Sequence, residues 1–459
     1  MMLPLKLNFL ITHPHLTFIV LLLSTLTLFL FQFLAAKSRR RVFLVDFACY
    51  KPPESQKCSR ESVVNRARQH GYSEENLSFM AKVLQRVGVG DSSYVAQSIM
   101  CDPPNLTMEA AREESESVIF GAVDALLAKT KVDCSEIGIL IVNCCVFSVF
   151  PSLSSVIVNR YKLREDISSY NITGMGCSAG LRAIGLAKQL LEVHPNACAL
   201  VVSTENTTSS AYEGSERSKI LVNCLFRIGG SAVLLSNKPS QRESSKYELL
   251  HAVHTQTASS DVSYRSIFRE EDAEGFTGVT INKDLLTAAI LTIEQHMKTL
   301  GVLILPLSEQ LLFVKSYIIQ RLSQAKIRPY IPKFNRCAEH FLPHVGGKPV
   351  LDELQKNLGF TDAHMEASTM TLHRFGNTSS SSVWYELAYV EAKDRVKKGD
   401  RIWHIAFGSG FKCSSVIWRA LVDVRAEEEN PWMSDINDYP VDSDNDGSFP
   451  YYFQPAKQQ

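Results

Sequence analysis

Residues 169–180 read SYNITGMGCSAG and contain a candidate nucleophile at the start of a helix. A short β-like run at 170–173 meets a turn with Gly174 and Gly176, and Cys177 then opens the helix. The glycines allow a sharp backbone reversal because they carry no Cβ. A cysteine in a first helical turn lies beside unpaired N–H groups and the positive end of the helix dipole, so we expect a lowered thiol pKa and a nucleophilic role. The alternative is a buried, inert thiol.

Outward from this turn, strand-like runs alternate with helix-like segments. Four short runs rich in Ile, Val and Leu read as buried strands, at 137–143, 199–203, 232–236 and 401–407. Two longer segments read as helices, at 107–129 and 178–193. This alternation predicts an α/β chain. No fixed-period repeat is visible, which neither supports nor excludes a larger two-fold duplication.

The composition is that of an ordinary globular protein. The chain has 459 residues, 45% of them hydrophobic, which suggests two large domains or one duplicated domain. The 48 basic side chains balance the 48 acidic ones, and zero net charge argues against nucleic-acid binding. The 11 cysteines are odd in number and form no CxxC pair. We therefore expect reduced thiols in the cytosol rather than disulfides or a zinc site.

The N-terminal segment 1–41 predicts a membrane anchor. Residues 16–34 carry no charge, and as a helix they would extend about 28 Å, close to the hydrocarbon core of a bilayer. A cleaved signal peptide is the alternative, although the apolar run is longer than usual for one. The bases that follow place the rest of the chain in the cytosol by the positive-inside rule: Lys37, Arg39, Arg40 and Arg41.

The C-terminal segment 426–459 is rich in Asp and Glu and has Lys457 as its only base. This composition predicts a solvated acidic tail after a body that runs over 42–425.

Residues 302–314 read VLILPLSEQLLFV and are followed by several bases. We favour a core helix with a solvated basic face. The alternative is a helix that lies on an anionic membrane surface and admits an acyl chain.

Histidines in the second half of the chain could assist a cysteine nucleophile. His344 lies in PHVGGKPVLDEL, just before a helix expected at 349–357, so its ring could enter a pocket. His340 lies four residues earlier and could share that face. For each of these, and for His373, the alternative is a structural histidine with satisfied hydrogen bonds.

Asn377 and a glycine turn complete the candidate residues. Asn377 lies in LHRFGNTSSSSVWYELAY, before a helix expected from Ser382, where a helix cap or Asx-turn is the alternative role. The turn Gly408-Ser409-Gly410 follows a predicted strand and could point a backbone N–H at a developing oxyanion.

Together these segments resemble the plant-type 3-ketoacyl-CoA synthases, the membrane-bound condensing enzymes of fatty-acid elongation. The motifs that carry the resemblance are VFLVDFACYKPP, NITGMGCSAG, NCLFRIGG, LPLSEQLLF, MTLHRFGNTSSSSVWYELAY and FGSGFKC. The resemblance implies an α/β, thiolase-like fold with duplicated αβαβα layers and an N-terminal transmembrane helix. One half would occupy 42–240 and the other 241–425.

The resemblance also implies the roles of three residues. Cys177 matches the acyl-accepting cysteine of the first half, and His344 and Asn377 match the catalytic residues of the second. His340 and His373 remain possible secondary residues. Thr173 stands where the family usually has Gly in NLGGMGCSAG, and it could narrow the space beside the turn.

The activity implied is a decarboxylating Claisen condensation of a long-chain acyl-CoA with malonyl-CoA, without a metal or redox cofactor. The resemblance places the enzyme in the endoplasmic-reticulum membrane, as a homodimer that meets other elongase subunits. Two other functions stay open: a polyketide-type synthase of the same superfamily, and a non-catalytic partner of active synthases. The predicted anchor argues against the first, and the presence of all three catalytic residue types argues against the second.

Overall fold

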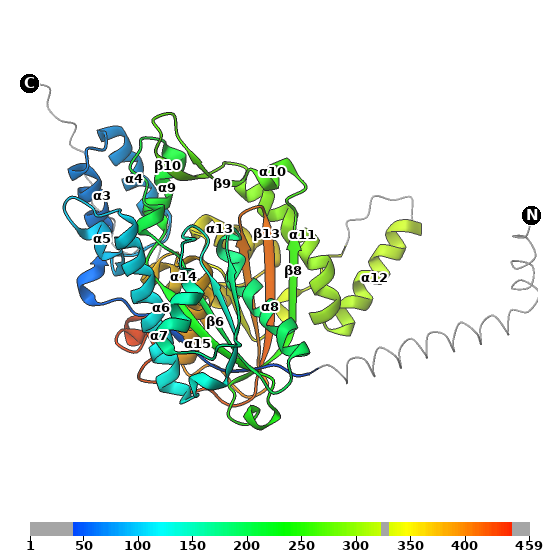
Figure 1. The fold of residues 1–459 in the computed structure, drawn as a ribbon. Coiled ribbons are helices and arrows are strands. Elements are labelled where there is room, and N and C mark those ends of the chain that lie inside the picture. Colours follow the sequence, from blue (N-terminus) through cyan, green and yellow to red (C-terminus); the bar gives the residue numbers. More distant parts are fainter. Residues whose placement is uncertain (1–39, 323–329, 443–459) are drawn as a thin grey trace, which may run out of the picture. The chain divides into compact units, whose positions relative to one another are not determined.

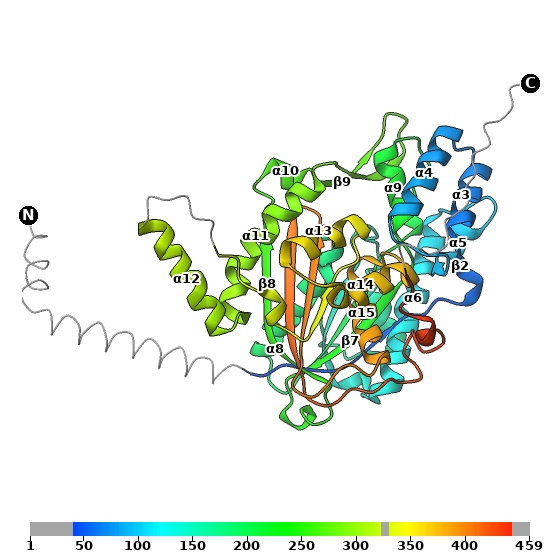
Figure 2. The same cartoon turned by 180° about the vertical axis from the view of Figure 1, so that it is seen from behind.

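The computed structural model describes residues 40–322 and 330–442. Internal contacts separate Met1–Arg41 from a compact unit that begins at Val42, and all strands and helices below belong to that unit (Figures 1 and 2). The predicted anchor at 16–34 lies outside the described residues. Within the described ranges, we find no helix with both the length and the apolar character needed to cross a bilayer.

Nine strands form one mixed sheet in the order β11-β12-β13-β8-β1-β7-β6-β4-β5. The bounds are β1 (Phe43–Cys49), β4 (Ile137–Asn143), β5 (Ser168–Ile172), β6 (Cys198–Thr204), β7 (Gly230–Ser236), β8 (Tyr247–Gln256), β11 (His340–Pro343), β12 (Arg401–Gly408) and β13 (Lys412–Ala420). The four predicted strands are confirmed as β4, β6, β7 and β12. They are buried almost throughout, as expected for strands covered on both faces.

The sheet repeats one pairing pattern. From β1 outward, β7 and β6 add antiparallel and β4 adds parallel to β6. From β8 outward, β13 and β12 add antiparallel and β11 adds parallel to β12. The antiparallel β1–β8 pair joins the two sets. The chain therefore contains two similar halves, a duplication that is not visible in the sequence. Along the chain their boundary lies between β7 and β8, and in the sheet they meet at the β1–β8 pair.

Helices lie between the halves and outside them. Between them, α8 (Ala179–Val193) packs on β6 and β4 of the first half and on β13 and β8 of the second, and α15 (Ser382–Ala392) packs on β1, β11 and β12. Outside, α6 (Met108–Thr130) packs on β7 and β1, while α11 (Leu285–Ile304) packs on β8 and β13 and α14 (Asp362–Phe375) on β11. Alternate residues of β4 face α8 and α6, because strand side chains alternate between faces.

Smaller elements surround these layers. They are β2 (Lys57–Cys58), α3 (Arg60–Gln69), α4 (Glu74–Arg86), β3 (Ser93–Tyr94), α5 (Gln97–Met100), α7 (Leu153–Tyr161), α9 (Arg217–Leu225), α10 (Asp261–Tyr264), β9 (Ile267–Glu271), β10 (Thr277–Ile281), α12 (Leu307–Leu322) and α13 (Lys348–Leu358).

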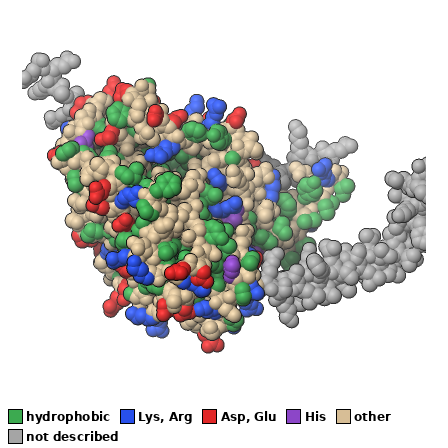
Figure 3. Space-filling view, in the orientation of Figure 1, with side chains coloured by type: hydrophobic (Ala, Val, Ile, Leu, Met, Phe, Trp, Pro, Cys, Tyr) green, Lys and Arg blue, Asp and Glu red, His purple; other side chains and the backbone are tan. Residues whose placement is uncertain are grey.

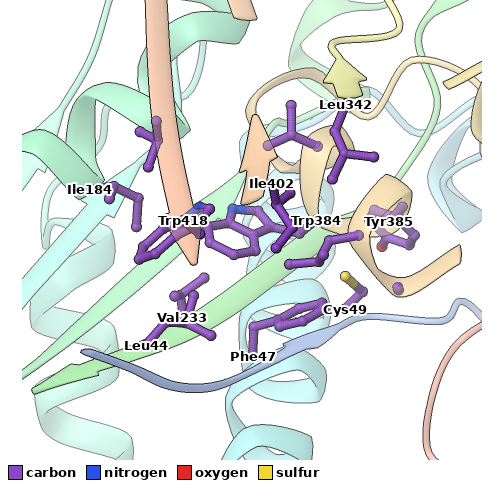
Figure 4. Close-up of a cluster of buried hydrophobic side chains, with 14 of the residues drawn as sticks. Leu44, Phe47, Cys49, Ile184, Val233, Leu342, Trp384, Tyr385, Ile402 and Trp418 are labelled. Carbon is purple, nitrogen blue, oxygen red and sulfur yellow. The ribbon is translucent and has the colours of Figure 1, made fainter. Parts of the chain in front are cut away.

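Large aromatic side chains fill the layer between the halves (Figure 4). The ring of Trp384, from α15, lies 6.2 Å from that of Trp418 on β13 and 5.4 Å from that of Phe47 on β1. One side chain thus contacts strands from both halves, so the halves share one core.

The prediction of a core helix at 302–314 is wrong. Pro306 separates α11 from α12, and α12 projects away from the rest of the body (Figures 1 and 2). Most apolar side chains of α12 are exposed. The structure describes every residue of α12, and Glu309 is the only one of them that is buried.

The prediction of a solvated acidic tail is also wrong for its described part, 426–442. Trp432 is fully buried and packs against the rings of Phe375 and Tyr389, at 5.1 and 4.8 Å. Glu427 pairs with Lys129 at 2.6 Å and with Lys246 at 2.8 Å. Aromatic burial and matched charges therefore hold a segment whose composition alone indicated solvation.

We expect Trp432→Ala to lower the free energy of unfolding by about 3–5 kcal/mol, because it leaves a large cavity in a packed aromatic cluster. Urea or thermal unfolding of the variant measures this change. Glu428→Ala, at an exposed position of the same segment, is the matched control and should have little effect. Equal stability of the two variants would mean that the segment does not contribute to the fold.

Candidate active site

Glycine geometry determines the position of Cys177. The turn after β5 contains Gly174 and Gly176, with φ of 66° and 60°, a region that favours glycine. A Cβ on Gly176 would lie 2.5 Å from the backbone nitrogen of Ser409, so only glycine lets the two turns approach this closely. Cys177 follows in a short 3-10 turn, immediately before α8.

A second close approach brings in the segment that carries Asn377. A Cβ on Gly180, in the first turn of α8, would lie 2.3 Å from the carbonyl oxygen of Ser380. The Asn377 backbone is further fixed by the chain after α9. Its N–H donates to the Leu225 carbonyl at 3.2 Å, and its carbonyl accepts from the Arg227 N–H at 3.0 Å.

These contacts gather the three predicted residues around one cavity. Cys177, His344 and Asn377 all line a cavity of about 210 Å³. That volume is many times the roughly 10–15 Å³ that one water requires, so the cavity can admit a substrate. The sulfur, ring and carboxamide come from the two halves of the fold, as expected.

The predicted direction of the Cys177 pKa is wrong. Burial raises the pKa of the Cys177 thiol to about 11, and a hydrogen bond from the Ser379 hydroxyl, 3.5 Å from Sγ, lowers it by less. The residue keeps partial solvent contact through the cavity, but protein surrounds its sulfur. Loss of hydration therefore outweighs the helix terminus, and the resting residue is a thiol.

Glu205 and Ser379 also belong to the site, although the sequence did not indicate them. The Glu205 carboxylate is buried and accepts backbone N–H groups of Cys145 and Val146 at 3.1 and 3.0 Å. The Ser379 hydroxyl lies 3.4 Å from Glu205 Oε2 and 3.5 Å from Cys177 Sγ. The Ser379 hydroxyl has one proton, so it donates either to the sulfur or to Glu205; while it donates to Glu205 it can accept the thiol proton, and in this way it connects the thiol to the carboxylate.

One sequence feature could have identified Glu205. It follows the apolar strand β6 directly, so it is a carboxylate at the end of a buried strand. Charged residues at such positions are rarely buried without a polar partner.

His344 is held as a neutral ring. Its backbone N–H donates to Ile405 at 2.8 Å, and its Nδ1 lies 2.5 Å from the hydroxyl of Ser382 at the start of α15. Burial lowers the pKa of His344 to about 3, so the ring is neutral near pH 7. A Ser382 hydroxyl that donates to Nδ1 leaves the proton on Nε2, where it can be donated to a substrate.

The amide of Asn377 is oriented by its own chain. Its Oδ1 accepts the backbone N–H of Ser379 at 2.8 Å. The side-chain NH₂ is thereby left as the donor at the cavity. With Ser382 donating to His344 Nδ1, the site presents two neutral N–H donors beside a thiol.

Other predicted residues lie elsewhere. His340 pairs with Asp400, with Nε2 3.0 Å from Oδ2, and does not line the cavity. His373 lies 3.4 Å from the Tyr439 hydroxyl and borders a different hollow. His340 and His344 therefore do not share a face. His340 is the first residue of β11, whereas His344 follows its last residue, Pro343.

The glycine turn contributes in part. Gly408 and Ser409 line the cavity, while Gly410 does not. Thr173 is exposed and borders a separate hollow of about 30 Å³, so it does not narrow the catalytic cavity.

All eleven cysteines lie in the described ranges and are free thiols.

Family models match most of the chain. Residues 34–322 match the FAE1/type III polyketide synthase-like family, and residues 338–420 match the C-terminal part of 3-oxoacyl-[acyl-carrier-protein] synthase III.

Curated relatives are similar over nearly the whole chain. It is 52% identical to 3-ketoacyl-CoA synthase 11 of Arabidopsis thaliana over 92% of this chain and 84% of the relative. It is 51% identical to 3-ketoacyl-CoA synthase 2 of the same plant, over 92% of this chain and 81% of the relative.

Solved structures share the fold at lower identity. A type III polyketide synthase domain from Dictyostelium superposes with a TM-score of 0.65 at 17% identity, over 83% of this chain and 100% of that one. Tetrahydroxynaphthalene synthase from Streptomyces coelicolor gives 0.64 at 18% identity, over 83% of this chain and 99% of that one. The fold is therefore of the thiolase-like α/β type.

We expect the rate at which a small neutral reagent alkylates Cys177 to rise about tenfold per pH unit between about pH 8 and about pH 10, because the thiolate reacts and the pKa is about 11. Mass spectrometry of the digested protein measures the rate. The exposed Cys101 is the reference for the reagent, and labelling of the buried Cys413 would reveal unfolding. A Cys177 rate that levels off below pH 9 would contradict the raised pKa.

Proposed function

Because this chain belongs to the 3-ketoacyl-CoA synthase family, we propose that it is an acyltransferase that condenses a long-chain acyl-CoA with malonyl-CoA, giving a 3-oxoacyl-CoA two carbons longer, CO₂ and CoA. The observation that carries the proposal is the shared cavity of Cys177, His344 and Asn377. A nucleophile and two neutral N–H donors are the groups that this reaction requires.

The first half-reaction transfers the acyl group to Cys177. The thiol must lose its proton as its sulfur attacks the thioester carbonyl, and its raised pKa means that a neighbouring group must accept that proton. Ser379 and Glu205 supply the route, from sulfur through the hydroxyl to the carboxylate. The departing CoA thiolate takes up a proton, which leaves acyl-Cys177 and free CoA.

The second half-reaction decarboxylates malonyl-CoA. Loss of CO₂ leaves an enolate at the thioester, whose oxygen accepts hydrogen bonds from His344 Nε2 and the Asn377 amide. Both donors are neutral and held in place before reaction, so little reorganisation is needed when charge develops.

Condensation then forms the new carbon–carbon bond. The enolate carbon attacks the acyl carbonyl on Cys177, and backbone N–H groups of Cys177 and of the Gly408–Ser409 turn stabilise the oxyanion. Collapse releases the 3-oxoacyl-CoA and expels the Cys177 sulfur, which takes its proton back from Glu205 through Ser379. The proton on free CoA comes from water and is the one that the overall reaction consumes. The two turns meet at Gly176, which supports this role for both.

A second cavity supports a long acyl chain as the substrate. It encloses about 140 Å³ and shares Ser210, Val222 and Phe226 with the catalytic cavity, so these residues form a common wall. Its other lining is largely apolar, with Val63, Ala67, Met80, Val95, Ile99 and Leu106. We propose that the acyl chain crosses this wall and that the second cavity receives its distal carbons.

The alternative functions are less well supported. Likeness to polyketide synthases at 17–18% identity concerns the fold, whereas the relatives above 50% identity are 3-ketoacyl-CoA synthases. The only feature that favoured a silent partner was Thr173, which lies away from the catalytic cavity.

Localisation and partners are proposed from the sequence. The charge-free residues 16–34 and the bases after them support an anchor in the endoplasmic-reticulum membrane with the catalytic body in the cytosol. Membership of the family supports a homodimer that works with the other elongase subunits.

We expect Cys177→Ala to abolish the acyl-enzyme. We expect His344→Ala and Asn377→Ala to retain acylation but to lower CO₂ release by about 10²–10³-fold, because each removes a donor to the enolate. Intact-protein mass spectrometry with acyl-CoA and CO₂ release from labelled malonyl-CoA measure the two steps. His340→Ala, outside the cavity, should retain both activities. Equal loss of both steps in the His344 and Asn377 variants would indicate a structural role instead.

We expect Val222→Ala to shift products toward longer chains and Val222→Phe toward shorter ones, because the first opens the common wall and the second closes it. Gas chromatography of products from acyl-CoA mixtures measures the shift. Ile220→Val removes a methyl from the same helix at a buried position that lines neither cavity, and should leave the profile unchanged. If neither Val222 variant changed the lengths of the products, the acyl chain would not cross the common wall. That result would not affect the proposal that the enzyme catalyses condensation.

A further inference from the structure

The hairpin formed by the end of α11 and by α12, residues 302–322, exposes an unusual amount of apolar surface. Figure 3 shows hydrophobic side chains gathered over this projecting part. The exposed members are Val302, Leu303, Leu307, Leu311, Leu312, Phe313, Val314, Tyr317, Ile318, Ile319 and Leu322. Soluble proteins rarely expose a continuous apolar patch of this kind without a partner.

The apolar residues surround α12 rather than forming one stripe. Successive helical residues are separated by about 100°, so Leu311, Phe313 and Ile319 point in three different directions. Their exposed fractions are 67%, 46% and 41%. A second protein would cover one face of the helix and leave the others in water, whereas lipid can surround it.

The base of the hairpin is built to hold α12 in this position. The buried Glu309 carboxylate accepts the Tyr330 hydroxyl at 2.6 Å, the Lys333 N–H at 2.9 Å and Arg336 Nη1 at 3.2 Å. The Ser316 hydroxyl accepts the Tyr330 N–H at 2.9 Å. These bonds fix α12 against the chain that returns to the body, so its exposure is a property of the fold.

The charges of the hairpin suit an anionic surface. Lys315, Arg321 and Lys333 are exposed around it. Glu309 is the only acidic residue of α12, and it is buried and paired. The exposed surface is therefore apolar and positive, which is the combination that binds anionic lipid.

We propose that the α12 hairpin lies in the headgroup and upper acyl region of an anionic membrane, as a contact separate from the predicted anchor at 16–34. The 16 residues of α12 extend about 24 Å, less than a hydrocarbon core, so the helix enters the interface without spanning it.

The hairpin also relates the membrane to the catalytic cavity. Leu285 and Ala289, at the start of α11, line that cavity, and Val302 and Leu303 at its end belong to the hairpin. One helix of 20 residues, about 30 Å long, thus connects the cavity to the membrane contact. The membrane-bound enzyme holds its cavity at a fixed distance from the lipid.

Photocrosslinking of the full-length chain tests this contact. The variant Leu311→p-benzoylphenylalanine is reconstituted in vesicles of phosphatidylcholine with about 30% phosphatidylserine and irradiated, and adducts are identified by mass spectrometry. The matched control is Phe150→p-benzoylphenylalanine, at a position that is 93% exposed on the first half of the fold. We expect at least about tenfold more phospholipid adduct at 311 than at 150.

Each other result would overturn part or all of the proposal. An adduct between two protein chains at 311 would assign the hairpin to a dimer interface, and absence of any adduct would place it in water. If vesicles of pure phosphatidylcholine gave as much lipid adduct as the anionic vesicles, the exposed bases would not contribute to membrane binding. The condensing activity of each variant confirms that it is folded, and it does not depend on the outcome of crosslinking.

Discussion

Direct approach of backbone to backbone at two glycines is the constraint on which the site depends. Gly176 allows the Cys177 turn to lie against the backbone of Ser409, and Gly180 allows α8 to lie against the carbonyl of Ser380. Any Cβ at either position would force the two halves apart. Because the nucleophile belongs to one half and its donors to the other, a shift of this size would separate the groups that must act on one substrate.

The electrostatic character of the site follows from its burial. Burial raises the pKa of Cys177 and lowers that of His344, so both side chains are neutral before substrate binds. Because both are neutral, Cys177 and His344 do not form a thiolate–imidazolium ion pair. The His344 ring therefore stays available to donate a hydrogen bond to the enolate. The raised pKa means that the Cys177 thiol does not lose its proton without a nearby acceptor. The Glu205 carboxylate, connected through Ser379, can be that acceptor.

A second set of contacts maintains the halves as one body. Lys246, which immediately precedes β8, pairs with Asp46 of β1, with Glu391 of α15 and with Glu427 of the C-terminal segment. Lys129 of α6 pairs with the same Asp46 and Glu427. The cluster holds three carboxylates and two ammonium groups, so removal of either lysine would leave partly buried carboxylates without a matching charge, at a cost of about 3–5 kcal/mol in comparable cases. The acidic segment is therefore a structural part of the seam between the halves.

The sequence alone determined the features that depend on neighbours along the chain. The apolar runs at 137–143 and 401–407 specify strands, and the glycines before Cys177 specify a turn and a helix start, because backbone preference and periodicity are local properties. Tertiary structure decided the rest. The pKa of Cys177, the partnership of Ser379 with Glu205 and the burial of Trp432 depend on groups that are distant in sequence. The exposure of α12 likewise depends on what the fold leaves uncovered, because a helix of the same composition would be a core element wherever another layer packed on it.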